Sequence, residues 1–210
     1  MNVMLINGSP NAKGCTFTAL CEVAGTLNRE GVQTQMFQVG TKPLSGCLDC
    51  YKCKETGRCV INDKVNDFLD MARNADGFVF GTPVHYSAAT GPMTCFMHRA
   101  FFANRCHGGD IFYLKPAAGV VSARRSGATT ALNQLNEYFT HAEMLVVGSK
   151  YWNMVYGMNP KEVRQDLEGL QTMRVLARNM AWLLRCKQAA SNSGVTLPER
   201  ENRIATNFIR

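Results

Sequence analysis

The chain has 210 residues, of which 46% are hydrophobic and 19% charged, and its formal net charge at pH 7 is +7. This length suits one domain with a sizeable core, and the composition excludes an intrinsically disordered chain. No apolar stretch approaches the ~20 residues that span a bilayer, and no basic leader precedes the first apolar run. We therefore expect a cytoplasmic protein without a membrane partner.

The positive charge favours an anionic cofactor over a nucleic acid. The basic residues are scattered, and the nearest approach to a cluster is Arg200, Arg203 and Arg210 near the C-terminus. Aromatic residues do not alternate with them, as they do where bases stack on a protein surface. We expect no nucleic-acid partner and a basic surface that attracts anionic ligands.

The first predicted strand, residues 3–7, ends in a glycine-bounded turn, and a helix follows over about residues 16–30. This turn gathers free amide groups, the hydroxyls of Ser9 and Thr16, and the positive end of a helix dipole, all of which attract a phosphate. The spacing matches neither the triphosphate loop nor the dinucleotide fingerprint, so it favours a terminal monophosphate such as that of FMN. The alternative is a surface turn in which Thr16 caps the helix.

The remaining segments alternate between strand and helix patterns. Predicted strands cover residues 32–39, 78–80, 117–121 and 144–147, and predicted helices begin at Asn62-Asp63, Pro92 and residue 128 and cover 161–188. We expect one α/β domain over residues 1–190, with a cysteine-rich insertion at 43–61 and a C-terminal tail at 191–210. Five β–α units imply a doubly wound parallel sheet with helices on both faces.

Three predicted loops leave the carboxyl ends of strands, at residues 8–16, 82–91 and 122–127. In a parallel sheet these ends meet at one edge, where ligands bind. The backbone of residues 84–87 suits the polar edge of a flavin, and His85 or Tyr86 suits its flat rings. The alternative makes Tyr86 an ordinary loop aromatic and His85 a surface residue.

The segments Asn7-Gly8-Ser9-Pro10 with Gly14-Cys15-Thr16, and Gly81 to Tyr86 with Gly91-Pro92, resemble the NADPH-dependent FMN reductase family of flavodoxin-like proteins. The resemblance covers roughly residues 1–150. It implies strand order 2-1-3-4-5, FMN as cofactor, NAD(P)H as cosubstrate, and a homodimer or homotetramer. It implies phosphate contacts from Ser9, Asn11, Gly14, Cys15 and Thr16. It implies flavin-ring contacts from Pro83, Val84, His85, Tyr86, Ser87, Ser122, Ala123, Arg124 and Gly127.

One loop departs from the family pattern. Residues 123–127 read Ala-Arg-Arg-Ser-Gly rather than a glycine-only turn. Arg124 and Arg125 are candidates for binding an anionic cosubstrate, and the alternative is a solvated basic pair.

Four of the nine cysteines, Cys47, Cys50, Cys53 and Cys59, have the spacing C-x2-C-x2-C-x5-C. Four thiols in one irregular loop can bind a [4Fe–4S] cluster, and Gly46 and Gly57 would let the backbone wrap around it. The segment resembles the compact cysteine motif of iron–sulfur flavoproteins, a branch of the same family. Zinc and no metal remain the alternatives. The other cysteines on helical stretches, Cys21, Cys95, Cys106 and Cys186, are predicted to pack in the protein interior.

These patterns favour an FMN-dependent oxidoreductase driven by NAD(P)H, with a small molecule or a redox protein as electron acceptor. Because the flavin supplies the chemistry, no catalytic acid–base pair is expected in the chain. Two alternatives remain open: an iron–sulfur flavoprotein that carries electrons, and a non-enzymatic redox sensor that uses the cysteine segment.

Overall fold

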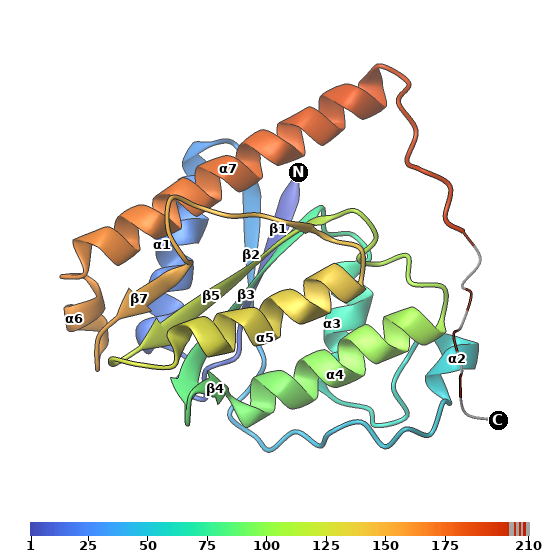
Figure 1. Ribbon diagram of the computed structural model, residues 1–210, viewed down its shortest axis with the longest axis horizontal. Coiled ribbons are helices and arrows are strands. Elements are labelled where there is room, and N and C mark those ends of the chain that lie inside the picture. Colours follow the sequence, from blue (N-terminus) through green and yellow to red (C-terminus); the bar gives the residue numbers. More distant parts are fainter. Residues whose placement is uncertain (202–203, 205, 207, 209–210) are drawn as a thin grey trace.

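The computed structural model describes residues 1–201 together with residues 204, 206 and 208. Part of the predicted tail, including Arg203 and Arg210, lies outside these residues. The centre of the molecule is a parallel sheet with strand order β2-β1-β3-β5-β6 (Figure 1). Its main strands are β1 (Asn2–Asn7), β2 (Gln33–Gln38), β3 (Gly77–His85), β5 (Pro116–Ala123) and β6 (Leu145–Val146). This order confirms the predicted flavodoxin-like fold.

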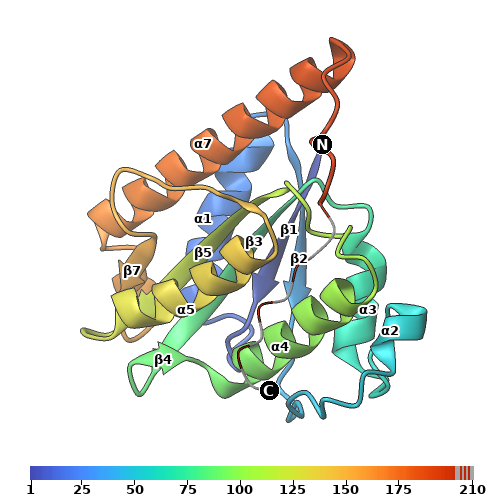
Figure 2. The same ribbon diagram turned by 45° about the vertical axis from the view of Figure 1, so that its right-hand side comes forward.

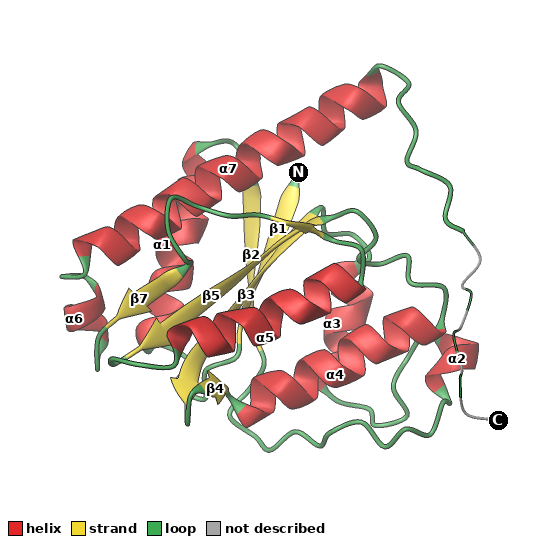
Figure 3. Cartoon of the chain, viewed as in Figure 1, coloured by secondary structure: helices red, strands yellow, loops and turns green. Residues whose placement is uncertain are grey.

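Helices cover both faces of the sheet (Figure 3). One face is covered by α1 (Cys15–Arg29), α6 (Pro160–Val163) and α7 (Leu167–Asn192), and the other by α3 (Lys64–Ala72), α4 (Gly91–Cys106) and α5 (Ala128–His141). A short helix, α2 (Cys53–Thr56), lies against the C-terminal end of α4. Within the described part of the chain, none of the helices combines the length and hydrophobicity that crossing a membrane requires.

The alternation of side chains along the strands builds two cores. In β1, Val3 and Leu5 face α1 and α7, whereas Met4 and Ile6 face α3, α4 and α5. Successive residues of a strand point to opposite faces, so a strand buried on both faces reads as an unbroken apolar run. Aromatic rings fill the second core, where Phe68 lies 5.0 Å from Phe96 between ring centroids.

Two predicted boundaries at the carboxyl edge are wrong. Strand β3 does not end at residue 80 but continues to His85, and a two-residue turn joins it to β4 (Ala88–Ala89) as an antiparallel hairpin. Residues 82–85 are therefore strand, not loop, because Thr82 and Pro83 continue the pairing with β5. Ser122 and Ala123, also predicted in a loop, are the last residues of β5.

The predicted fifth strand is present as β6, an additional strand follows it, and the predicted last helix is divided into α6 and α7. β6 pairs with the start of β5, and a separate strand, β7 (Met154–Tyr156), pairs with its end. Between them the Asn153 side chain bonds the Ser149 hydroxyl at 2.8 Å, which favours a local polar loop over a continuous strand. The final helix begins at Leu167 rather than residue 161, because Asp166 caps it by accepting a hydrogen bond from the Gly169 amide at 2.9 Å.

Candidate functional site: a rim of strand ends and a cysteine segment

The loop after β1 is held by its own backbone and by two side-chain amides, that of the buried Asn7 and that of the half-buried Gln38. The Gly8 amide donates to the Gly81 carbonyl at 2.8 Å, which extends the sheet by one residue. The Asn7 side chain is fully buried, and its oxygen accepts from the Ser9 amide at 3.1 Å. Gln38 of β2 donates to the Ser9 carbonyl at 2.7 Å. These bonds fix the direction in which the loop leaves the sheet.

The N-terminus of α1 presents uncapped amide groups at this loop. Gly14 occupies the N-cap position and has no side chain to bond the first turn. Helix amides left without partners, together with the helix dipole, suit a phosphate. Ser9 is buried and its hydroxyl oxygen accepts from the Asn11 amide at 3.1 Å, so its proton is left to donate. Asn11 itself is exposed.

The three predicted loops meet in the structure. The Thr16 and Ser122 hydroxyls form a buried hydrogen bond of 2.8 Å, which joins the first loop to the end of β5. The Thr90 hydroxyl donates to the Gly8 carbonyl at 3.0 Å, which joins the first loop to the segment after β4. Gly127 lies so close to the β3–β4 turn that an added Cβ would be 2.6 Å from the Ser87 Cα. Residues 8–16, 82–90 and 122–127 therefore form one continuous rim.

The β3–β4 turn is the most exposed part of this rim. Tyr86 is fully exposed, and both Tyr86 and Ser87 have left-handed backbones, with φ of 49° and 59°. A turn with two positive φ values matches the twist of a hairpin, but non-glycine residues in it are strained. Pro83 and Val84 are half-buried, whereas His85 is exposed. The flavin-ring contacts expected from residues 83–87 stay predictions.

The third loop is exposed where it departs from the family pattern. Arg124 and Arg125 are exposed, whereas Gly127 is half-buried with a left-handed φ of 84°. The flavin contacts expected from Ser122, Ala123, Arg124 and Gly127 stay predictions. The Ser122 hydroxyl is already bonded to Thr16. A ligand bound at this loop would therefore be contacted mainly by its main-chain groups.

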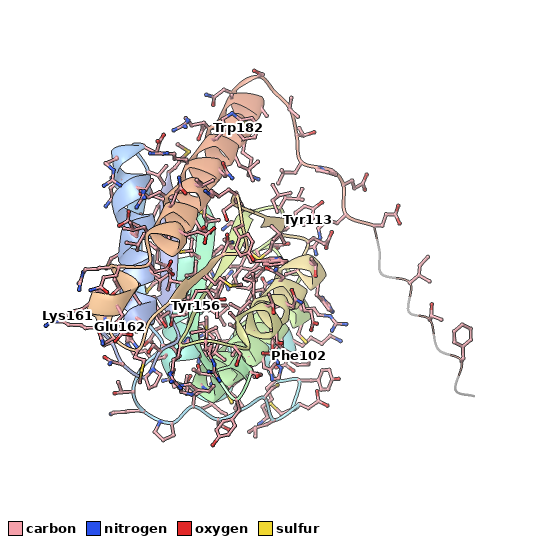
Figure 4. All side chains as sticks on the ribbon, turned by 60° about the vertical axis from the view of Figure 1, so that its left-hand side comes forward. Phe102, Tyr113, Tyr156, Lys161, Glu162 and Trp182 are labelled. Atoms are coloured by element: carbon pink, nitrogen blue, oxygen red, sulfur yellow. The ribbon has the colours of Figure 1, made fainter. Side chains whose placement is uncertain are left out.

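A fourth segment of the rim escaped the sequence analysis. The Gly157 amide donates to the Ala123 carbonyl at 3.0 Å, and the Cys15 thiol donates to the Gly157 carbonyl at 3.5 Å. Figure 4 places Tyr156 on the same part of the molecule as Lys161 and Glu162 of α6. The only sequence signal was Asn159-Pro160, a cap and a first-turn proline. Burial raises the pKa of the Cys15 thiol, so this thiol is neutral at pH 7 and does not repel a phosphate.

The cysteine segment, residues 43–61, lies apart from the rim and has little regular structure. It runs along the outside of α4, from the end of β2 to α2 (Figures 1 and 2). Cys47 and Cys50 are exposed, Cys59 is half-buried and Cys53 is buried. Asp49 and Tyr51, on either side of Cys50, have left-handed backbones with φ of 51° and 56°. Strain of this kind collects at functional sites.

Side chains hold this segment where secondary structure does not. The Asn66 side chain is buried; it accepts from the Cys59 amide at 2.8 Å and donates to the Cys59 carbonyl at 2.9 Å. Phe102 of α4, labelled in Figure 4, contacts the ring of Tyr51, with centroids 5.5 Å apart. Gly57 has a left-handed φ of 68° and ends α2, whereas nothing lies within 4 Å of the Cβ position of Gly46.

All four predicted ligand cysteines line one small cavity of about 20 Å³. Burial raises the pKa of the Cys53 thiol to about 11, and the neighbouring thiols of Cys106 and Cys47 add to the shift. Cys106, predicted only to pack, thus neighbours this set, whereas Cys21, also predicted to pack, is exposed on α1. All nine cysteines are free thiols, so none of the four is consumed in a disulfide. Thiolate donors suit a [4Fe–4S] cluster, and ligation requires them to lose their protons.

The donor set fits a cluster in its chemistry. In the part of the chain that the structure describes, no three His, Cys, Asp or Glu side chains stand in a metal-binding arrangement. The residues that would hold a cluster are Cys47, Cys50, Cys53 and Cys59, and this assignment stays a prediction.

A larger cavity of about 610 Å³ lies between α4 and α5. Three aromatic rings line it, Phe101, Phe102 and Tyr138, together with His98 and Glu137. Cys47 lines both this cavity and the small one, so the two adjoin. The sequence offered no sign of this cavity, because its walls come from α4, α5 and segments as distant along the chain as Asp49 and Arg200.

Comparison with known proteins places these features in context. A family model described as NADPH-dependent FMN reductase matches residues 1–159. An iron–sulfur flavoprotein of Methanocaldococcus jannaschii is 30% identical over 192 residues, covering 86% of this chain and 96% of its own.

Solved structures share the fold. A crystal structure of RosB with a bound 8-demethyl-8-formylriboflavin-5'-phosphate intermediate has a TM-score of 0.67 at 17% identity, with 100% of this chain and 94% of that chain covered. A flavodoxin from the domain Archaea has a TM-score of 0.59 at 16% identity, with 88% of this chain and 99% of that chain covered.

Proposed function

Because this chain belongs to the NADPH-dependent FMN reductase family, we propose that it is an oxidoreductase that binds FMN at the rim. The observation that carries the proposal is the meeting of three strand-end loops at the uncapped N-terminus of α1. When bound, the flavin accepts and donates electrons, and the protein supplies binding and orientation.

Different loops of the rim would contact different parts of the flavin. The first loop and the first turn of α1 would hold the phosphate through Ser9, Asn11, Gly14, Cys15 and Thr16. The β3–β4 hairpin and the loop after β5 would contact the rings. The contact of Gly127 with Ser87 fixes the spacing of those two walls.

A second observation favours a further redox centre in the same chain. Four free thiols line one cavity, and the relative that is 30% identical is named an iron–sulfur flavoprotein. We propose that Cys47, Cys50, Cys53 and Cys59 would hold a [4Fe–4S] cluster, which would supply one-electron chemistry toward a protein or small-molecule partner. Reduced nicotinamide as donor, and assembly into a homodimer or homotetramer, are proposals drawn from the family.

Flavin binding is tested by adding excess FMN, and separately riboflavin, to flavin-free protein before desalting. We expect one FMN per chain. Riboflavin, which lacks the phosphate, should bind at least about tenfold more weakly, because charge-assisted hydrogen bonds contribute about 1.5–3 kcal/mol. Colourless protein, or equal affinity for the two flavins, would contradict the site.

The redox centres are tested by anaerobic purification with iron and sulfide analysis, followed by addition of NADPH or NADH. We expect four iron atoms per chain and bleaching of the flavin absorbance by at least one nucleotide. Protein that binds FMN but contains no iron overturns the cluster and leaves the flavin site standing. A flavin that stays oxidised excludes both nucleotides as donors.

A further inference from the structure

The deepest cation in the described chain belongs to Arg99 of α4. Its side chain is 0% exposed, and the residue is the largest of those that are fully buried. A charged guanidinium is costly to remove from water and is retained only when it is paired and hydrogen-bonded. Arginine also stays charged at every accessible pH. The arrangement around Arg99 therefore requires an explanation.

Arg99 binds the cysteine segment at both of its ends. Its guanidinium forms a bidentate pair with the Asp63 carboxylate, at 2.7 and 2.9 Å, and donates to the Ile61 carbonyl at 2.8 Å. A longer contact of 3.5 Å reaches the Ser45 carbonyl, before the first cysteine. One planar group thus ties the entry and the exit of the segment to α4.

The remaining donor of the same guanidinium points at sulfur. Nε of Arg99 donates to the Cys59 Sγ at 3.2 Å. This bond is not needed to place Cys59, because Asn66 already binds both its amide and its carbonyl. The bond to sulfur therefore acts mainly on the charge that the sulfur carries. Hydrogen bonds to ligand sulfurs are among the factors that set the potential of an iron–sulfur cluster.

We propose that Arg99 is a positioning residue for the cluster site: it fixes both ends of the cysteine segment, and its Nε hydrogen bond to Cys59 raises the reduction potential of the cluster. The inference rests on the proposed cluster. A positive charge and a donor beside a ligand sulfur stabilise the more negative, reduced state. Loss of either should make the cluster harder to reduce.

The test compares Arg99→Gln, Arg99→Lys and the matched control Arg58→Gln. Arg58 neighbours Cys59 in sequence, but its side chain is exposed and paired with Asp70, so the control removes an equal charge from the segment without touching the bond to the Cys59 sulfur. The first measurement is the reduction potential of the cluster, by anaerobic titration followed by electron paramagnetic resonance. We expect Arg99→Gln to shift the reduction equilibrium at least about tenfold, or 59 mV for one electron, toward the oxidised form. The reduction potential of Arg99→Lys should lie between those of the wild type and Arg99→Gln, and that of Arg58→Gln should equal the wild-type value.

The second measurement uses metal-free protein with FMN bound, so that it does not depend on the cluster. We expect amide hydrogen exchange in residues 45–61 to accelerate at least about tenfold in both Arg99 variants and to stay unchanged in Arg58→Gln. If Arg99→Gln does not fold, Arg99→Lys keeps the buried charge and supplies both readings.

Each outcome decides one part of the proposal. Unchanged potentials in a variant that assembles its cluster overturn the effect on the sulfur, and unchanged exchange overturns the positioning role. Wild-type protein that binds FMN but no cluster overturns the cluster and the claim about its potential together. The exchange measurement then decides the positioning role alone.

Discussion

The rim and the cysteine segment are two sites built by different means on one sheet. The rim is made of strand ends, and its parts are joined by main-chain and hydroxyl bonds such as those of Gly8, Thr16 and Thr90. The cysteine segment has one short helix and is tied to the fold by the side chains of Arg99 and Asn66. The register of the sheet therefore secures the rim, whereas single side chains secure the segment.

The largest expected effect comes from Gly127→Val, which tests whether the rim depends on close backbone contact. The new Cβ would meet the Ser87 Cα at 2.6 Å, at a left-handed φ of 84°. We expect a loss of about 3–5 kcal/mol in the free energy of unfolding and no FMN binding, from strain and overpacking together. Urea unfolding and FMN titration give both numbers.

The matched control is Gly46→Val in the cysteine segment. Nothing lies within 4 Å of the added Cβ, and the backbone there is not left-handed. We expect a change within about 0.5 kcal/mol. Equal losses at the two glycines would remove the contrast between the regions.

The next largest loss in the free energy of unfolding is expected from Asn66→Leu, which removes the side chain that binds the backbone of Cys59. It leaves the part-buried amide and carbonyl of Cys59 without their Asn66 partner, at a cost of about 2 kcal/mol. Hydrogen exchange should rise in residues 57–63 while the dissociation constant of FMN stays unchanged. The exposed neighbour Asn62→Ala should alter stability by less than about 0.5 kcal/mol. Weakened FMN binding in Asn66→Leu would mean that the two regions are coupled.

A smaller effect is expected at the buried pair Thr16 and Ser122, whose hydroxyls lie 2.8 Å apart. A double-mutant cycle of Thr16→Val and Ser122→Ala should give a coupling energy of about 1 kcal/mol in unfolding. An exposed pair, Thr34 and Asn28 at 3.1 Å, is the control and should couple by less than about 0.5 kcal/mol. A zero coupling at the rim pair would show that the first and third loops are held independently.

The smallest changes in stability are expected at two tyrosines with left-handed backbones, Tyr86 in the rim and Tyr51 in the cysteine segment. Tyr86→Asn should stabilise the fold by about 0.5–1 kcal/mol, since Asn tolerates a left-handed φ, and weaken FMN binding about threefold. Tyr51→Asn relieves the same strain but loses the ring contact with Phe102, so its net change should be near zero. Thermal unfolding and FMN titration are measured for both. Unaltered FMN binding in Tyr86→Asn would make Tyr86 an ordinary turn residue.

Much of the rim could be predicted from the sequence, for physical reasons. Apolar runs such as residues 3–7 are long enough to identify strands buried on both faces. Parallel pairing then places every strand end at one edge, so the meeting of the first and third loops at Thr16 and Ser122 follows from topology. The cap at Asp63 was readable too, because it accepts from Val65 in the first turn of α3.

Other features depend on contacts that no local pattern records. The Arg99–Asp63 pair joins residues 36 positions apart, and within its own helix Arg99 reads as an ordinary polar residue. The three residues of β7 are too few to carry a period, so the fourth segment of the rim was missed. The length of β3 was underestimated because Thr82 and Pro83 look like turn residues, although their pairing with β5 makes them strand.

The anchoring of Ser45 and Ile61 through their carbonyl oxygens has an evolutionary consequence. Every amino acid offers the same oxygen, so this attachment places no demand on which side chains stand between the two points. Exposed side chains such as those of Cys47 and Cys50 can therefore change while these two attachments persist. Sequence change at such positions would leave the strand-end rim on the far side of the attachments untouched, because the rim is joined by its own main-chain and hydroxyl bonds.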